Sequence, residues 1–192
     1  MSSTNRSKAR EEHVADYYVT PINDINLFLK ELEITYGYQL NFGKILDPCA
    51  GGDSVNEMSY PKAISQYNEK IETIDIREDS RANIKGNYLE IDCKNKYDVI
   101  ITNPPFFIAQ EIISKAIDDI KCGGIVVMLL RLNYFGSDIR QPFWKANMPK
   151  YTFVHHKRIG FIPESRKTDS IEYMHCIWEK GYKKNTTELR II

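Results

Sequence analysis

Apolar residues along the chain follow two patterns. In residues 22–36 they recur every three or four positions, as at Ile25, Leu29 and Leu32, and this spacing is typical of one face of an α-helix. Residues 125–132 are instead almost continuously apolar, which is typical of a strand buried on both sides of a sheet. The chain therefore mixes amphipathic helices with buried strands.

The two patterns alternate along the chain. Helices are expected at 22–36, in part of 57–67, and at 78–84, 107–121 and 138–147. Strands are expected at 44–47, 71–75, 87–91, 97–102, 125–132, 151–155 and 171–178. Strands that alternate with helices predict an α/β fold with a seven-stranded, mostly parallel sheet and helices on both faces. The last two strands, joined by a polar loop, predict a C-terminal antiparallel hairpin.

Length and composition indicate an ordinary globular protein. The chain has 192 residues, of which 42% are apolar, enough for the core of one domain. No apolar run approaches the ~20 residues of a membrane span. The first residues are polar and lack an apolar signal core, so we expect a flexible tail at 1–12, a single domain at 13–192 and no secretion.

Four cysteines lie at positions 49, 93, 122 and 176 without a Cys-x-x-Cys pair. These spacings fit neither zinc ligation nor a small disulfide scaffold, so we expect reduced thiols and a cytoplasmic protein. His155 and His156 are neighbours on a predicted strand and would point to opposite faces. We therefore expect no metal.

Charge is unevenly distributed although the net charge is zero. Residues 31–139 contain 11 Lys/Arg and 17 Asp/Glu, whereas residues 140–192 contain 11 Lys/Arg and 5 Asp/Glu. The basic C-terminal quarter is consistent with a polyanion contact and equally with a solvated lysine-rich surface.

Residues 97–106, YDVIITNPPF, form the most informative segment. A short apolar run leads into Asn103, and Pro104 and Pro105 prevent the strand from continuing. Asn103 would then lie at the carboxyl end of a strand, where open α/β sheets bind ligands. Its amide oxygen and the Pro104 carbonyl can accept two hydrogens of an amino group, and Phe106 offers a flat face to a base. The simpler alternative is a strand that ends in a proline turn.

This segment resembles the catalytic motif of S-adenosylmethionine-dependent amino-methyltransferases, especially the DNA adenine-N6 family. A second resemblance lies after the first strand, in the sequence Asp47-Pro48-Cys49-Ala50-Gly51-Gly52. It is neither a GxGxxG motif nor a P-loop, and it resembles the cofactor loop of methyltransferases. The resemblance implies that the loop approaches the cofactor.

Asp75 ends the second strand, and its carboxylate can accept hydrogen bonds from both hydroxyls of a ribose. Ile76 could pack on adenine. Taken alone, Asp75 would more simply be a surface residue. In the corresponding family pattern an acidic residue follows the third strand, whereas here Asn87 stands at that position and Asp92 is a second candidate. Near the N-terminus, Tyr18, Thr20 and Pro21 resemble an aromatic-x-Thr-Pro element that approaches the methionine part of the cofactor.

The C-terminal region resembles the end of small phage-type adenine methylases. That resemblance implies phosphate contacts for Arg158, Arg166 and Lys167 and a contact with the target base for Phe161. Each residue also has a simpler interpretation as a surface charge or a core aromatic.

Together these resemblances imply a Rossmann-like methyltransferase fold, S-adenosylmethionine as cofactor, and methyl transfer to the N6 amino group of adenine in DNA. They imply catalytic roles for Asn103, Pro104, Pro105 and Phe106. The chain has no room for a separate target-recognition domain, so the loops 133–150 and 156–170 or an accessory protein would recognise the target. The alternatives are an RNA adenine-N6 or guanine-N2 methyltransferase, a protein glutamine methyltransferase, and a non-catalytic cofactor-binding module.

Overall fold

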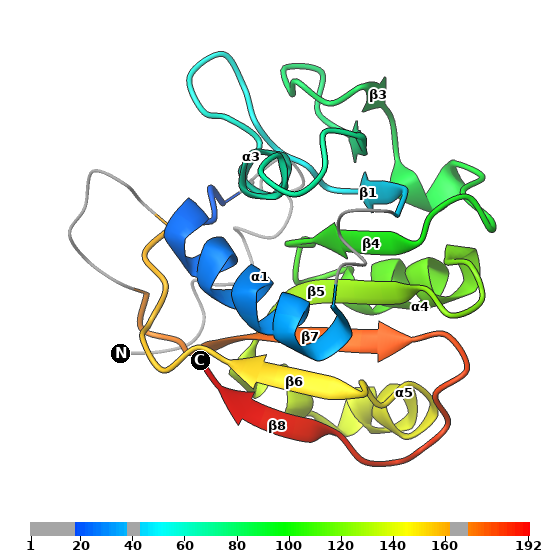
Figure 1. Cartoon of the computed structure of the whole chain (residues 1–192). Helices are drawn as coiled ribbons and strands as arrows, with labels where there is room; N and C mark the ends of the chain where they lie inside the picture. Colours follow the sequence, from blue (N-terminus) through cyan, green and yellow to red (C-terminus); the bar gives the residue numbers. More distant parts are fainter. Residues whose placement is uncertain (1–17, 38–42, 162–168) are drawn as a thin grey trace.

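A mixed β-sheet forms the centre of the protein (Figure 1). In the computed structural model, which describes residues 18–37, 43–161 and 169–192, eight strands lie in the order β3-β2-β1-β4-β5-β7-β6-β8. They are β1 (Ile45–Asp47), β2 (Ile71–Asp75), β3 (Ile84–Lys85), β4 (Val99–Thr102), β5 (Ile125–Arg131), β6 (Tyr151–Val154), β7 (Tyr173–Glu179) and β8 (Glu188–Ile191). The first five strands run parallel to one another, β7 runs antiparallel to both β5 and β6, and β8 is parallel to β6.

Helices cover both faces of the sheet. On one face lie α1 (Ile22–Tyr36) and α3 (Ser59–Ile64), and on the other lie α4 (Ala109–Asp119) and α5 (Gln141–Ala146) (Figure 1). Three short 3-10 helices complete the described elements: η4 (Tyr88–Glu90), η5 (Leu132–Phe135) and η6 (Asp138–Arg140). No helix in the described ranges is long and apolar enough to cross a membrane. The α/β prediction with helices on both faces is confirmed.

The apolar runs explain why β4 and β5 lie at the centre. Every residue of β4 is buried, as are Ile125–Leu130 of β5. Alternate side chains of these strands enter two cores, since Val126 and Met128 pack on the α4 side whereas Ile125 and Val127 pack on the α1 side. Burial of such runs is the main favourable contribution to folding. Because β1, β2, β4 and β5 are parallel, their carboxyl ends lie at the same edge of the sheet.

Two predicted elements around β3 are wrong. Residues 78–84 do not form a helix, because the Ser80 hydroxyl donates to the Gly51 carbonyl (2.5 Å) and accepts from the Ala82 amide (3.1 Å). These side-chain bonds hold a turn instead of a helix. Residues 87–91 were expected to form a strand, but Asn87 accepts from the Leu89 amide and starts the 3-10 helix η4. The third strand is the shorter β3.

The C-terminal region also differs from the prediction. The expected helix at 138–147 is divided into η6 and α5. The sheet has eight strands instead of seven, because β8 pairs with β6. β8 has no buried apolar run, and the charged Glu188 and Arg190 protect it as an edge strand. The predicted antiparallel pairing of the preceding two strands is confirmed. The predicted tail at 1–12 lies outside the described residues.

A chain of three buried polar side chains crosses the α1 face of the sheet. His175 of β7 is fully buried, and its Nε2 lies 2.8 Å from the Tyr60 hydroxyl while its Nδ1 lies 2.8 Å from His155 Nε2. The Phe28 ring stacks on His175 with 3.9 Å between the ring centroids. Burial, followed by the charge of neighbouring His156, lowers the pKa of His155 to about 4, and burial also lowers the pKa of His175. Both imidazoles are therefore neutral in the folded protein near pH 7.

We predict that acid weakens the fold through His155. The unfolded side chain titrates near 6.5 and the folded one near 4, so the folded state binds fewer protons between these values. The stabilisation of the folded state by neutral His155 is complete above pH 6.5 and is lost as the pH falls toward 4. The free energy of unfolding should decrease by ~3 kcal/mol over this interval. Urea unfolding at pH 7 and pH 4.5 measures it.

The matched variants His155→Gln and Asp47→Asn separate opposite contributions to this pH dependence. The pKa of Asp47 is raised from 3.8 to about 7 in the folded protein. The contribution of Asp47 to stability therefore decreases as the pH rises from 3.8 toward 7. His155→Gln should lose less stability on acidification than the wild type, and Asp47→Asn should lose more. Identical pH slopes for the wild type and His155→Gln would contradict the prediction.

Candidate active site

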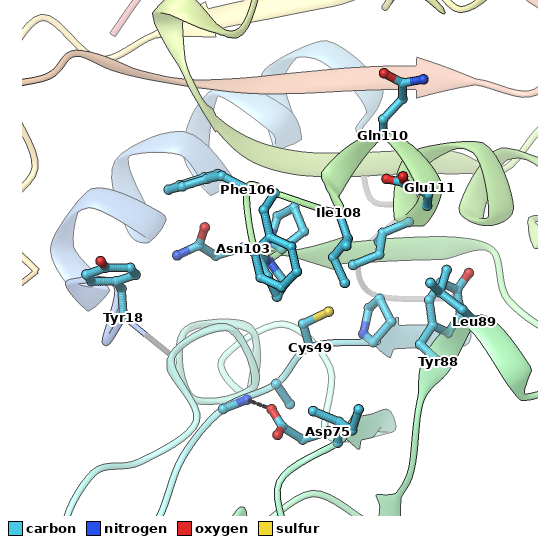
Figure 2. Close-up of a pocket in the computed structure, with 18 of the residues that line it drawn as sticks. Tyr18, Cys49, Asp75, Tyr88, Leu89, Asn103, Phe106, Ile108, Gln110 and Glu111 are labelled. Atoms are coloured by element: carbon cyan, nitrogen blue, oxygen red, sulfur yellow. Dashed lines mark hydrogen bonds between the residues drawn. The ribbon is translucent and has the colours of Figure 1, made fainter. Parts of the chain in front are cut away.

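A cavity of about 1170 Å³ opens at the carboxyl ends of the parallel strands. The segments after β1, β2, β4 and β5 contribute to its walls, together with the segment before α1 and the first turn of α4. Figure 2 shows Asn103 and Phe106 near Cys49, with Tyr18 on one side and Tyr88 and Leu89 on the other. One pocket therefore gathers segments that are far apart in the sequence.

Most of the residues expected to bind cofactor or target line this cavity. They are Tyr18, Thr20, Pro48, Cys49, Ala50, Gly51, Gly52, Asp75, Ile76, Asn87, Asn103, Pro104, Pro105 and Phe106. Asp47 and Pro21 do not line it. Pro21 is the residue that precedes α1. The Asp47 carboxylate is buried behind the loop and accepts a bond from the Cys49 amide at 3.2 Å. Burial, with a smaller effect from the Asp75 charge, raises the pKa of Asp47 to about 7.

Asn103 is held between two parts of the chain. Its Nδ2 donates to the Thr20 hydroxyl at 3.1 Å, across 83 residues of sequence. Its Oδ1 is buried and has no hydrogen-bond partner among the described residues. A buried acceptor without a partner costs about 1–3 kcal/mol, so its retention marks a site where a ligand donor is expected.

The glycine loop and Asp75 form one hydrogen-bonded unit. Gly51 and Gly52 have φ values of 66° and 72°, a region that favours glycine. Asp75 Oδ2 accepts from the Gly51 amide at 2.7 Å, and Oδ1 accepts from the Arg77 amide at 2.9 Å (Figure 2 marks the first bond). Asp75 thus fixes the loop while remaining part of the cavity wall. Ile76, beside it, is 52% exposed and offers an apolar surface to a ligand.

The segment after β3 lines the end of the cavity that lies away from Tyr18 (Figure 2). Asn87 lines it, but its Oδ1 accepts from Leu89 N and its Nδ2 donates to Glu90. Asp92, the second candidate, is not part of the lining. Cys49 lines the cavity with its sulfur directed inward (Figure 2), and burial raises the pKa of its thiol. Cys49 is therefore a neutral small residue near pH 7.

The residues predicted to bind nucleic acid have different surroundings. Phe161 is buried, packs edge-on against Tyr18 and Tyr173, and does not line the cavity. Arg158 forms an exposed ion pair with Glu172 at 2.7 Å. Such exposed pairs contribute little to stability. Arg166 and Lys167 lie outside the described residues.

Several lining residues were missed by the sequence analysis. Tyr60 comes from α3, Glu111 from the first turn of α4, and Arg131 from the end of β5. Arg131 had a readable signal, because it is the polar residue that ends the buried apolar run of residues 125–130. Within the described part of the chain, no group of three or more His, Cys, Asp or Glu side chains could hold a metal ion.

The sequence matches no protein-family model and no curated protein, but its fold is found in solved structures. A protein from Listeria monocytogenes assigned as a class I S-adenosylmethionine-dependent methyltransferase has a TM-score of 0.62 at 15% identity over 91% of this chain and 65% of its own. A Pyrococcus horikoshii protein assigned as an RNA methyltransferase has a TM-score of 0.62 at 15% identity over 86% of this chain and 87% of its own.

A third similar structure is the type I restriction enzyme EcoKI M protein, with a TM-score of 0.56 at 14% identity over 80% of this chain and 46% of its own. The chain therefore spans about two thirds of the Listeria protein and about half of the EcoKI M protein. At these identities the likeness defines the fold, which is the class I methyltransferase fold. The Rossmann-like fold predicted from the sequence is confirmed.

We predict that a side chain at position 52 of the glycine loop lowers the stability of the fold. An added Cβ would lie 2.6 Å from Met58 Cγ and 3.2 Å from Met58 N, at a φ of +72°. Gly123 is a matched control, since its φ is +75° but nothing lies within 4 Å of an added Cβ. Gly123→Ala should cost only the ~1–2 kcal/mol of backbone strain.

Gly52→Ala should cost a further ~1–3 kcal/mol for the overlap with Met58. Thermal or urea unfolding of the two variants checks the difference. Equal destabilisation of both variants would mean that the loop has room for a side chain.

Proposed function

We propose that the protein transfers a methyl group from S-adenosylmethionine to the exocyclic N6 amino group of adenine in DNA. The observation that carries the proposal is Asn103, an amide at the end of β4 whose buried Oδ1 lacks a partner among the described residues. It faces the same cavity as the glycine loop and Asp75. An acceptor for an amino group and the features expected of a nucleoside site thus lie together.

The residues present fit the proposed cofactor. Gly51 and Gly52 let the backbone approach a ligand closely. The Asp75 carboxylate would accept from the ribose hydroxyls, and Ile76 would pack on adenine. Thr20 and Tyr18 would border the methionine part. When bound, S-adenosylmethionine supplies a methyl group on a sulfonium that leaves readily, so the chain must mainly align the acceptor nitrogen with that methyl.

Asn103 and Pro104 would activate the acceptor amine. An aromatic amino group is a poor nucleophile because its lone pair is delocalised into the ring. Asn103 Oδ1 and the Pro104 carbonyl would accept its two hydrogens and stabilise the nitrogen as positive charge develops. No hydrogen bond to the Pro104 carbonyl is found in the described part of the chain. The Thr20 hydroxyl would orient the Asn103 amide through the bond that it accepts from Nδ2.

The target base would stack on Phe106 after leaving the nucleic-acid helix. Phe106 is partly exposed at the cavity and packs on Tyr173 at 6.0 Å between ring centroids. Extrusion of a base requires a pocket of this kind, with polar groups for its edge and an aromatic face.

Two similar structures favour DNA as the acceptor, and a third favours RNA. One of the two is the EcoKI M protein described above. The other is a Vibrio vulnificus modification subunit, with a TM-score of 0.58 at 12% identity over 98% of this chain and 50% of its own. Both are type I modification proteins, and they support DNA as the acceptor. The Vibrio protein is one subunit of a larger enzyme, which also supports an accessory protein for target recognition. The Pyrococcus structure supports RNA as the alternative acceptor. A glutamine amide in a protein could also use the Asn103 turn, whereas a non-catalytic module would not need its unpaired acceptor.

We predict that Asn103→Ala abolishes methyl transfer while cofactor affinity is retained. Removal of one preorganised acceptor from a transition-state site should reduce the rate by ~10²–10³-fold or more. The assay supplies labelled S-adenosylmethionine with duplex DNA, single-stranded DNA, RNA or cell-extract protein in separate reactions. Label in DNA at adenine N6 is the expected result.

Phe106→Ala is the companion variant. It should mainly weaken substrate binding, by about 1–3 kcal/mol of lost stacking, and so raise KM more than it lowers kcat. Wild-type turnover by Asn103→Ala would remove the NPPF turn from catalysis. Label found only in protein or only in RNA would replace the DNA assignment.

We also predict that Asp75→Ala weakens S-adenosylmethionine binding by about 1.5–3 kcal/mol, because a charge-assisted bond to the ribose and the anchor of the Gly51 amide are both lost. Calorimetry measures the affinity. Asp79→Ala is the control, since Asp79 lies on the same turn but is exposed and is not part of the cavity lining. Unchanged affinity for Asp75→Ala would exclude Asp75 from the cofactor site.

A further inference from the structure

Arg131 lies on the acceptor side of the cavity. In the sheet order β2-β1-β4-β5, the glycine loop and Asp75 follow β1 and β2, Asn103 follows β4, and Arg131 ends β5. Asn103 therefore separates Arg131 from the proposed cofactor half. An acceptor that reaches past Asn103, away from the glycine loop, would therefore meet Arg131.

Arg131 is also tied to the proposed base-stacking surface. Its guanidinium carbon lies 4.7 Å from the centroid of the Phe106 ring, a distance at which a cation is attracted to a ring face. It also interacts with the Tyr173 hydroxyl, which donates to Asp169 at 2.5 Å. These contacts hold the guanidinium beside the place where a target base would stack.

Arg131 forms no direct ion pair within the described residues. The ion pairs found among the described residues all involve other Lys and Arg side chains. The Arg131 Nε is buried and has no hydrogen-bond partner among those residues. The Asp169 carboxylate interacts with the Arg131 charge. Against the opposing effect of burial, the Tyr173 hydrogen bond and this charge lower the pKa of Asp169, but the carboxylate does not satisfy the buried Nε. A buried donor without a partner is unfavourable, and an anion bound in the cavity would supply the missing acceptor.

Arg140 provides a contrast within the same cavity. Its Nε donates to the Tyr134 carbonyl at 2.8 Å, and its guanidinium carbon lies 4.2 Å from the Tyr134 ring centroid. Its Nη2 also donates to the Gly136 carbonyl at 3.5 Å, so two of its nitrogens have partners in the protein. Both arginines are positively charged and line the same cavity. They differ at Nε, which has a protein acceptor in Arg140 and none among the described residues in Arg131.

We propose that Arg131 binds a phosphate group of the acceptor nucleotide, while the base of that nucleotide lies on Phe106 with its amino group at Asn103. The guanidinium fork matches phosphate oxygens, and hydrogen bonds between these charged groups are strong. The assignment rests on the proposed function and deepens it, because a protein glutamine side chain brings no phosphate to this position. Arg131 is therefore a specificity determinant for nucleotide acceptors.

The test measures binding of minimal acceptors to the whole chain. The protein is saturated with S-adenosylhomocysteine, so that added nucleosides do not occupy the cofactor half. Affinities for 2′-deoxyadenosine, its 5′-monophosphate and its 3′-monophosphate are then measured by ligand-observed NMR titration. One monophosphate should bind about 10-fold or more tightly than the nucleoside.

Arg131→Gln should remove this preference for phosphate, and Arg131→Lys should retain part of it because the charge remains. Arg140→Gln is the matched control and should keep the preference. Binding of S-adenosylhomocysteine should be unchanged in all three variants, which shows that the fold is intact. For nucleic-acid substrates, Arg131→Gln should raise KM for the acceptor.

Three results would overturn the assignment: no preference for phosphate in the wild type, an unchanged preference in Arg131→Gln, or an equal loss in Arg140→Gln. These results are separable from a failure of the proposed function. If the preference depends on Arg131 but no methyl group reaches nucleic acid, the proposed reaction fails alone. If DNA is methylated but Arg131→Gln behaves as the wild type, the phosphate contact fails alone.

Discussion

Burial of the apolar runs in the parallel strands is the constraint on which the site depends. β1, β4 and β5 pair side by side in one sheet, and helices on both faces of that sheet cover these runs. Because the strands are parallel, the residues that follow these runs reach one common edge of the sheet. Asn103 and Arg131 are brought beside the loop that follows β1 in this way. The site is thus a consequence of how the core is covered.

The glycine loop illustrates how the same burial fixes details of the site. Asp47 and Asp75 end neighbouring strands, yet they have different environments. Asp47 is enclosed behind the loop and supports its turn through the Cys49 amide. Asp75 holds the Gly51 amide and still forms part of the cavity wall. Two similar residues at equivalent positions therefore have different roles, one inside the scaffold and one at the ligand surface.

The sequence was informative where one strong local pattern determined the outcome. Helix α1 and strand β2 have the predicted bounds, and the NPPF turn lies where the apolar run stops. It failed where side chains or distant segments decide the structure. The Ser80 hydroxyl replaces a predicted helix by a turn through its bond to Gly51, and β8 forms only because β6 offers it an edge. The run that ends at Arg131 predicts a polar residue at the end of a strand, but it does not predict the contact of Arg131 with the Phe106 ring after β4.

The hydrogen bond between Asn103 and Thr20 has a consequence for biosynthesis. A ribosome makes Thr20 long before Asn103, since 83 residues separate them. The strand next to β4 is β5, whose other edge is covered only by β7 near the end of the chain. Long-range pairings of this kind form late. A chain that stops before β7 therefore leaves the outer edge of β5 unpaired beside the turn that carries Asn103.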